Sequence, residues 1–289
     1  ARVKSSPAKR PRSIADLAPV RAVDTFRPLK WLARGWRDLI QCGWISVAHG
    51  AAVSTFGAAL FLLAHDRFWL LAGALTGFLV VAPVVATGLY ALSRALERGE
   101  PADEQLLLRT WTHWGNNRRS DPASYWCLVR FGMLLALAGT GWVITSSAYI
   151  TLFAPVPIAS PADFVRHIVL APNHFIFEGW LVLGGVLAAP VFASSVISMP
   201  LLLDRHVTAL DAVLASWRVV MANPVPMAVW AALLMGLTLF GFVTAFIGMI
   251  VVIPLLGHAS WHAYRDLIDP TALPERIAPT ASGDAGAAS

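Results

Sequence analysis

Residues 225–257, VPMAVWAALLMGLTLFGFVTAFIGMIVVIPLLG, decide the class of fold because they contain no Asp, Glu, Lys or Arg. An apolar helix of about 20 residues already crosses the hydrocarbon core of a bilayer. A water-soluble protein would have to bury this whole run, and the chain has too little polar surface to cover it. The run therefore predicts membrane-spanning helix.

Four further segments also lack these charged residues, at 45–64, 69–92, 131–153 and 179–203. The whole chain is 57% hydrophobic and 13% charged, whereas a soluble domain has about 25% charged residues. We therefore predict an all-α membrane protein with a single transmembrane helical domain at residues 27–269. The predicted spans are 45–64, 69–92, 124–153, 175–203, 225–240 and 242–258.

The division of 225–257 into two spans depends on its length. As one helix it would be about 50 Å long, well beyond a hydrocarbon core of about 30 Å. Gly236 and Gly241 lie near its middle and could supply a turn between two short helices. A single long helix, which would give five spans in total, is the alternative.

A weak internal repeat favours two helices. Each pair of spans is preceded by an amphipathic segment that contains Trp, at 27–40, 103–111 and 210–220. Such segments suit the membrane interface. The second span of each pair contains a proline, at Pro83, Pro190 and Pro254. We therefore predict about six spans in three hairpin units, each preceded by an interfacial helix.

The basic residues indicate the orientation. Residues 1–40 hold ten Lys/Arg against three Asp/Glu, and the predicted outer loops hold only Arg67 and Arg166. Because cytoplasmic loops carry the excess of Lys and Arg, we expect both termini in the cytoplasm and the protein in a bacterial inner membrane. Residues 1–26 are expected to be a disordered basic arm near lipid headgroups, and 270–289 a disordered tail. Nucleic acid is not an expected partner.

A few residues are candidates for contact with lipid or with a partner protein. Ionisable residues inside a membrane are costly to bury and are therefore often functional. Arg130 is expected to reach the inner headgroups, and Glu178 shares a helix face with His174 near the outer surface, where a proton relay is the alternative. Aromatic residues gather at membrane interfaces. The candidates for these contacts are Arg130, Glu178, His174, Trp31, Trp36 and Trp261.

Three histidines are candidate cofactor ligands. His258 and His262 are four residues apart and share a helix face, and His49 is expected at a similar depth in the first span. A haem held between two helices needs such a matched pair. The alternative is that these are interfacial histidines with polar partners, in which case no cofactor is bound. No metal site and no catalytic residue are predicted.

The segment PLLGHASWHAYRDL at 254–267, with WLARGWRDL at 31–39, resembles a family of predicted prokaryotic integral membrane proteins of unknown function. Some members of that family are labelled cytochrome c oxidase subunits. The resemblance implies a helical inner-membrane protein and brings no established catalytic residues. The chain lacks the histidine set of the haem–copper catalytic subunit, so the label implies an accessory subunit of an oxidoreductase complex, not an enzyme by itself.

Three functions are compatible with these patterns. The first is a non-catalytic membrane subunit or assembly partner of a larger complex, which would contact lipids and other membrane subunits. The second is a small-molecule or lipid transporter or channel, with a cavity lined by hydroxyl side chains. The third is a haem- or metal-binding protein that uses His49, His258 and His262.

Overall fold

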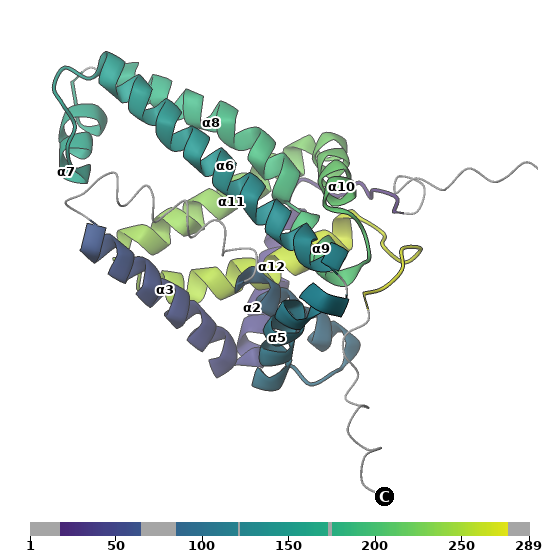
Figure 1. The fold of residues 1–289 in the computed structure, drawn as a ribbon. Helices are drawn as coiled ribbons and strands as arrows, with labels where there is room; N and C mark the ends of the chain where they lie inside the picture. The colour runs from purple at the N-terminus through teal and green to yellow at the C-terminus, as the bar shows by residue number, and fades with distance from the viewer. Residues whose placement is uncertain (1–17, 65–84, 121, 173–174, 277–289) are drawn as a thin grey trace, which may run out of the picture.

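The computed structural model describes residues 18–64, 85–120, 122–172 and 175–276, and these ranges are helical apart from loops and two isolated β-bridges (Figure 1). Residues 85–98 are helical in addition to the labelled helices. The labelled helices are α2 (Arg27–Cys42), α3 (Trp44–Ala64), α5 (Glu104–Ser120), α6 (Pro122–Phe153), α7 (Pro161–Phe164), the π-helix η1 (Val165–Val169), α8 (Phe175–Ser195), α9 (Ser198–Asp204), α10 (Ala209–Ala222), α11 (Pro224–Val243) and α12 (Met249–Leu267).

Four helical segments of the described chain are long and apolar enough to cross a membrane. They are Trp44–Leu63, Val129–Phe153, Phe175–Asp204 and Pro224–Val243. The predicted all-helical class is therefore confirmed. Most of the predicted span 69–92 lies outside the described residues, and α12 is not among the four segments. The total of six spans in three hairpins stays a prediction.

The run 225–257 forms two helices, α11 and α12, but the turn between them is not where the sequence predicted it. Gly236 and Gly241 both lie inside α11, and the chain turns at residues 244–248 instead. Ala245 and Phe246 adopt positive φ angles of 52° and 69° in that turn. This conformation is unfavourable for residues with a Cβ atom, and tertiary contacts offset the cost. The hydroxyl of Ser54 on α3 donates to the carbonyl of Phe246 at 2.6 Å.

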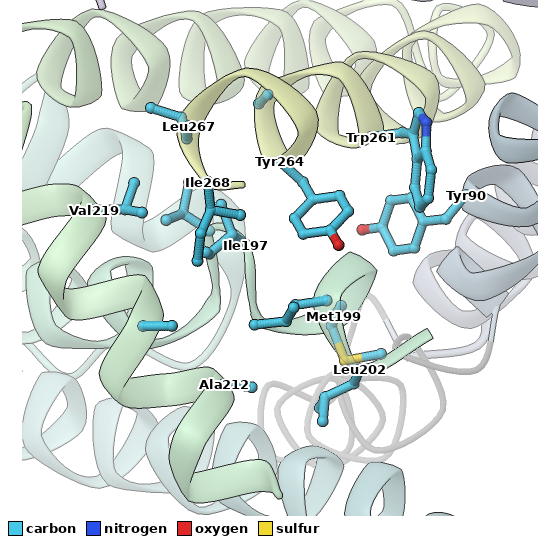
Figure 2. Packing of buried hydrophobic residues seen from close by; sticks show 14 of the residues in the cluster. Tyr90, Ile197, Met199, Leu202, Ala212, Val219, Trp261, Tyr264, Leu267 and Ile268 are labelled. Atoms are coloured by element: carbon cyan, nitrogen blue, oxygen red, sulfur yellow. The ribbon is translucent and has the colours of Figure 1, made fainter. Parts of the chain in front are cut away.

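Helix α12 lies at the centre of the described fold. It packs against α2, α3, α9 and α11. Figure 2 shows Trp261, Tyr264 and Leu267 of α12 within the buried cluster that also includes Ile197 and Leu202. On the side of α2, the rings of Trp31 and Trp230 meet edge to face with centroids 5.6 Å apart. These contacts bury large apolar side chains, which is the main source of folding stability away from lipid.

Two glycines let α2 and α3 approach α12 closely. A Cβ atom on Gly35 of α2 would lie 2.7 Å from the backbone nitrogen of Ala259. A Cβ atom on Gly50 of α3 would collide with the carbonyl of Ile250. That carbonyl is four residues before Pro254, which has no N–H to donate to it. Close backbone packing through small residues is a common way for helices to associate in membranes.

The residues just before α2 and just after α12 pack together, within segments that the sequence predicted to be disordered. Val20 forms a β-bridge with Ile268, and the amide of Arg21 donates to the carbonyl of Leu267 at 2.9 Å. Glu275 likewise forms a bridge with Arg205. Residues 18–26 and 270–276 therefore belong to the folded domain, because their backbones satisfy hydrogen bonds there. The rest of the two predicted disordered segments lies outside the described residues.

These bridges place the two described chain ends at the same end of the helices, which we call the basal end. This is the arrangement expected if both termini are on one side of a membrane. At the opposite end of α2 from these bridges, Cys42 shares a small apolar cluster with Leu107 of α5. The assignment of the basal end to the cytoplasm stays a prediction.

Helices α6 and α8 form a long pair that extends away from the basal end, with α7 and η1 at the far tip (Figure 1). The predicted span 175–203 corresponds to α8 and α9 together. The helix is continuous through Pro190 and breaks at residues 196–197 instead. A proline can remain inside a helix in this way when the lost hydrogen bond is tolerated locally.

We predict that Gly35→Ala destabilises the protein by about 1–3 kcal/mol, because the added methyl group has no room against the backbone of Ala259. Gly236→Ala in α11 is the matched control, since no neighbouring atom lies within 4 Å of its would-be Cβ. That control should be neutral or stabilising by up to about 1 kcal/mol. Thermal unfolding in detergent measures both, and equal effects would contradict the close packing of α2 on α12.

Candidate functional site

A chain of buried polar side chains joins four helices near the basal end. His262 Nε2 lies 2.9 Å from Asp38 Oδ2, and the Ser93 hydroxyl donates to the same oxygen at 2.6 Å. His258 Nδ1 lies 2.8 Å from Ser93 Oγ, and His258 Nε2 lies 2.8 Å from Ser46 Oγ. Asp38 comes from α2, Ser46 from α3, Ser93 from helical residues 85–98, and both histidines from α12. We call these five residues the polar chain.

The hydrogen-bond directions in the polar chain follow from the number of available protons. The Ser93 hydroxyl has one proton, which it donates to Asp38, so it can only accept from His258. His258 therefore carries its proton on Nδ1, and its Nε2 accepts the proton of the Ser46 hydroxyl. In this arrangement His258 is neutral and both of its ring nitrogens are satisfied, which avoids the cost of a buried unpaired polar atom.

The pairing of Ser46 with His258 has the distance found when an imidazole activates a nucleophilic hydroxyl. Ser46 and His258 are both fully buried, however, and Ser93 is 1% exposed. No substrate reaches an atom that is closed off in this way. What the geometry supports is a structural role, in which satisfied hydrogen bonds fix α2 and α3 on α12.

Two more carboxylates, Asp266 of α12 itself and Glu97 of helical residues 85–98, join the basal end of α12 to its neighbours. Asp266 accepts hydrogen bonds from Arg27 at 2.6 Å, Trp31 at 2.9 Å and Arg34 at 3.1 Å, all from α2. Burial alone would raise the pKa of Asp266, but these three hydrogen bonds outweigh it and hold the pKa below its ordinary value. On the other side, Glu97 accepts from Trp261 at 2.9 Å. The end of α12 is thus tied to α2 and to helical residues 85–98.

Asp204, at the end of α9, collects a further set of donors. The Tyr264 hydroxyl donates to it at 2.8 Å, and Arg205 Nε at 3.0 Å. Arg94 and Arg98 lie 3.7 and 3.8 Å from its other carboxylate oxygen. Asp204 is 2% exposed, so these cations and the hydroxyl compensate a buried charge.

The structure brings two of the three predicted histidine ligands together but leaves little free to bind a cofactor. Both ring nitrogens of His258 are bonded to serines, and His262 Nε2 is bonded to Asp38. His49 is different, because its buried Nε2 has no hydrogen-bond partner and its ring lies 5.8 Å from that of Trp111. Within the described residues, no group of three or more His, Cys, Asp or Glu side chains is placed to hold a metal ion. A ligand role for these histidines stays a prediction.

The residues predicted to contact lipid or a partner have different environments. Trp31 and Trp261 are buried, where their indole N–H groups donate to Asp266 and Glu97, so neither faces lipid. Trp36 is 47% exposed. Arg130 and Glu178 are exposed on α6 and α8, and His174 lies outside the described residues.

Three of the hydroxyl side chains that a transport path would use are bonded elsewhere. The candidates for such a path are Ser54, Thr55, Thr76, Thr87, Ser194 and Ser195. Ser194 and Ser195 donate to carbonyls of their own helix at 2.7 and 2.8 Å, and Ser54 donates to the carbonyl of Phe246. Thr55 is exposed, Thr87 is buried, and Thr76 lies outside the described residues. These side chains therefore do not gather along one described cavity.

An apolar hollow of about 800 Å³ lies between α6 and α8. Many of the residues around it are small: Ala138, Gly139, Gly141, Gly184 and Ala188. Its hydroxyls belong to Thr145 and Ser195, and both donate to carbonyls of their own helices, at 2.7 and 2.8 Å. The hollow therefore presents an apolar surface, and its small side chains allow another helix to approach the backbone of α6 and α8.

The sequence reasoning missed Asp38, Ser46 and Ser93, because each stands in a separate helix and nothing in the sequence pairs them. A usable signal was the placement of Asp38 on the apolar side of an amphipathic helix, four residues after Arg34. Asp266 follows His262 by four residues on α12, but its carboxylate faces Arg27 and Trp31 of α2.

We predict that Ser93→Ala destabilises the protein by about 1–3 kcal/mol, because Asp38 and His258 Nδ1 each lose a buried hydrogen-bond partner. Ser260→Ala on α12 is the control, since its hydroxyl donates only to the carbonyl of Leu256 in the same helix. That change should stay within about 0.5 kcal/mol. Chemical unfolding in detergent compares the two, and a neutral Ser93→Ala would show that the polar chain does not stabilise the fold.

We also predict a pH dependence for Asp266. The pKa of Asp266 is lower in the folded protein than in the unfolded chain. The ionised carboxylate therefore stabilises the fold above the unfolded pKa of about 3.9, and this stabilisation is lost as the pH falls through the pKa of the folded state. Asp266→Asn should therefore cost about 2 kcal/mol from pH 8 to pH 5, and the cost should shrink below about pH 4. Glu104→Gln on exposed α5 is the control. A penalty for Asp266→Asn that does not change with pH would contradict the ion pairs.

Comparison with known proteins gives one match. Residues 70–204 match a family described as "Predicted integral membrane protein (DUF2189)". The match spans slightly less than half of the chain, from the segment before α5 to the end of α9, and its description does not mention an oxidase. No curated protein and no solved structure matches the chain. The family description and the four candidate spans agree that the chain is an integral membrane protein with several apolar helices.

Proposed function

We propose that the chain is a non-catalytic subunit or assembly partner of a larger membrane complex, and that the α6–α8 hollow receives a transmembrane helix of that complex. The observation that carries the proposal is the hollow itself. It is apolar, it is open along two candidate spans, and its wall is made largely of small residues. Small residues let two helix backbones approach closely, and this is how helices associate in a membrane, where apolar burial alone gives little gain.

The low burial of α6 agrees with this role. Within the candidate span Val129–Phe153, 11% of its 18-residue apolar window is buried inside the protein, against 44% of the corresponding window in Phe175–Asp204. The principal neighbours of α6 are α5, α8, α9 and α10, and Figure 1 shows α5, α9 and α10 near the end of α6 that lies away from α7. Most of the outer part of α6 is therefore available to lipid or to another protein.

The hollow is less suited to a polar substrate than to a transmembrane helix. The donor groups of Thr145 and Ser195 are already used within their own helices. In the polar chain, Ser46, Ser93 and His258 are buried and bonded to one another, so a substrate has no access to them. A respiratory complex of the cytochrome c oxidase type is the first candidate for the larger assembly, on the family resemblance alone.

The test uses two glycines with equal freedom to accept a side chain. Gly141 lines the hollow and Gly185 does not, and neither would place a Cβ within 4 Å of another group. We predict that Gly141→Leu lowers recovery of the partner after native purification by roughly tenfold, which corresponds to about 1.4 kcal/mol of binding free energy. Gly185→Leu should leave recovery unchanged, and thermal unfolding should show that both variants fold.

A photoreactive residue at position 138 identifies what occupies the hollow. The proposal expects one transmembrane segment of another protein to be cross-linked from position 138 and not from position 185. Cross-linking to residues 65–84 of the same chain, or to lipid alone, would reject the partner helix. Unchanged recovery with Gly141→Leu would reject it as well.

A further inference from the structure

Helix α2 has two opposite apolar faces, and only one of them is used in packing. Its buried face consists of Pro28, Trp31, Gly35, Asp38, Leu39 and Cys42. The other face carries Leu29, Trp36 and Ile40, with Phe26 at the N-cap beside it, and the four side chains are 50%, 47%, 61% and 66% exposed. With 3.6 residues per turn, these four side chains form one stripe on the side away from α12. We call it the α2 stripe.

Two unpaired cations border the α2 stripe on one edge. Lys30 and Arg37 are seven residues apart, so they lie two turns apart along the same edge, and both are exposed. Neither forms a hydrogen bond or ion pair with a residue that the structure describes. Arg27 and Arg34 of the same helix, by contrast, are both bound to Asp266. The sequence thus provides two cations beyond those that the fold uses.

The chain itself fixes where α2 lies relative to a bilayer. The helix ends at Cys42, and the candidate span begins at Trp44 after the single residue Gly43, whose φ is 57°. Trp44 is 65% exposed, so the α2 stripe continues directly into the exposed surface of the span. A helix joined to a span through one residue lies at the boundary of the membrane.

Helix α10 repeats the same pattern at the same end of the molecule. Its exposed apolar side chains are Leu210, Leu214, Trp217 and Met221, at the spacing of one helical stripe. It connects the candidate span that ends at Asp204 with the one that begins at Pro224. Two helices on one boundary therefore leave an apolar stripe uncovered.

We propose that α2 lies in the membrane interface and binds anionic phospholipid, with the α2 stripe among the acyl chains and with Lys30 and Arg37 on the lipid phosphates. Apolar side chains on one face and cations at its edge are the chemistry that recognises an anionic bilayer surface. A protein partner would leave the charges of Lys30 and Arg37 to be compensated separately, whereas phospholipid satisfies the stripe and the cations together. This inference is independent of what occupies the α6–α8 hollow.

The first experiment measures the depth of the α2 stripe with a spin label on Ile40→Cys in the full-length protein, reconstituted in phosphatidylglycerol–phosphatidylcholine vesicles. Cys42 and Cys127 are both buried, and burial raises the pKa of the Cys42 thiol to about 11, so neither competes for the label. We expect the label to be accessible to oxygen and shielded from a water-soluble nickel chelate. Access to the chelate, or shielding from both reagents by a protein contact, would overturn the proposal.

The second experiment measures lipid preference by native mass spectrometry of protein released from mixed-lipid nanodiscs. The preference for phosphatidylglycerol over phosphatidylcholine should be roughly tenfold lower in the double variant Lys30→Gln/Arg37→Gln than in the wild type. Arg109→Gln/Arg166→Gln, which removes the same charge from α5 and η1, should keep the preference of the wild type. An equal loss in both double variants, or no loss in either, would contradict a specific role for Lys30 and Arg37.

Discussion

Helix α12 carries polar and charged side chains on positions that its neighbours bury, and the rest of the structure is arranged to compensate them. His258 is bonded on both ring nitrogens, Asp266 takes three donors from α2, and Tyr264 donates to the buried Asp204. An unpaired group of this kind costs several kcal/mol when it is buried. The partners come from α2, α3, α9 and helical residues 85–98, so satisfying α12 sets the positions of four other elements.

This compensation divides the molecule into two regions with different physics. At the basal end, hydrogen bonds, ion pairs and large buried aromatics hold the helices at fixed distances, and glycines at 35 and 50 allow the close approach that these bonds need. In the α6–α8 pair the polar groups are few. The hydroxyls of Thr140, Thr145 and Ser195 donate within their own helices, and the indole N–H of Trp180 on α8 donates to Ser146 on α6 at 2.7 Å. This division agrees with a protein whose polar basal end lies at the membrane surface. The apolar helices α6 and α8 would then contact lipid or the helices of other proteins.

The sequence predicted the features that follow from whether a segment is surrounded by lipid or by water. Long uncharged runs gave the helical membrane class, and amphipathic Trp-containing segments gave α2, α5 and α10 as helices. The turn between α11 and α12 could not be predicted from glycine positions, because it is held by the contact of Ser54 with Phe246 across 192 residues. The polar chain was equally hidden, since Asp38, Ser93 and His258 are far apart in sequence. Spacing on α12 alone grouped His258 with His262, and a helix face does not reveal which neighbour each side chain will contact.

The most direct test of this account is the protonation state of His258 in the full-length protein in lipid bilayers, read by solid-state NMR of isotopically labelled histidine. The hydrogen bonds to Ser46 and Ser93 require a neutral ring with its proton on Nδ1 and an acceptor at Nε2. We predict that the wild-type protein shows this neutral tautomer and that the Ser93→Ala variant does not. A doubly protonated imidazolium at neutral pH, or a ring protonated on Nε2, would contradict it.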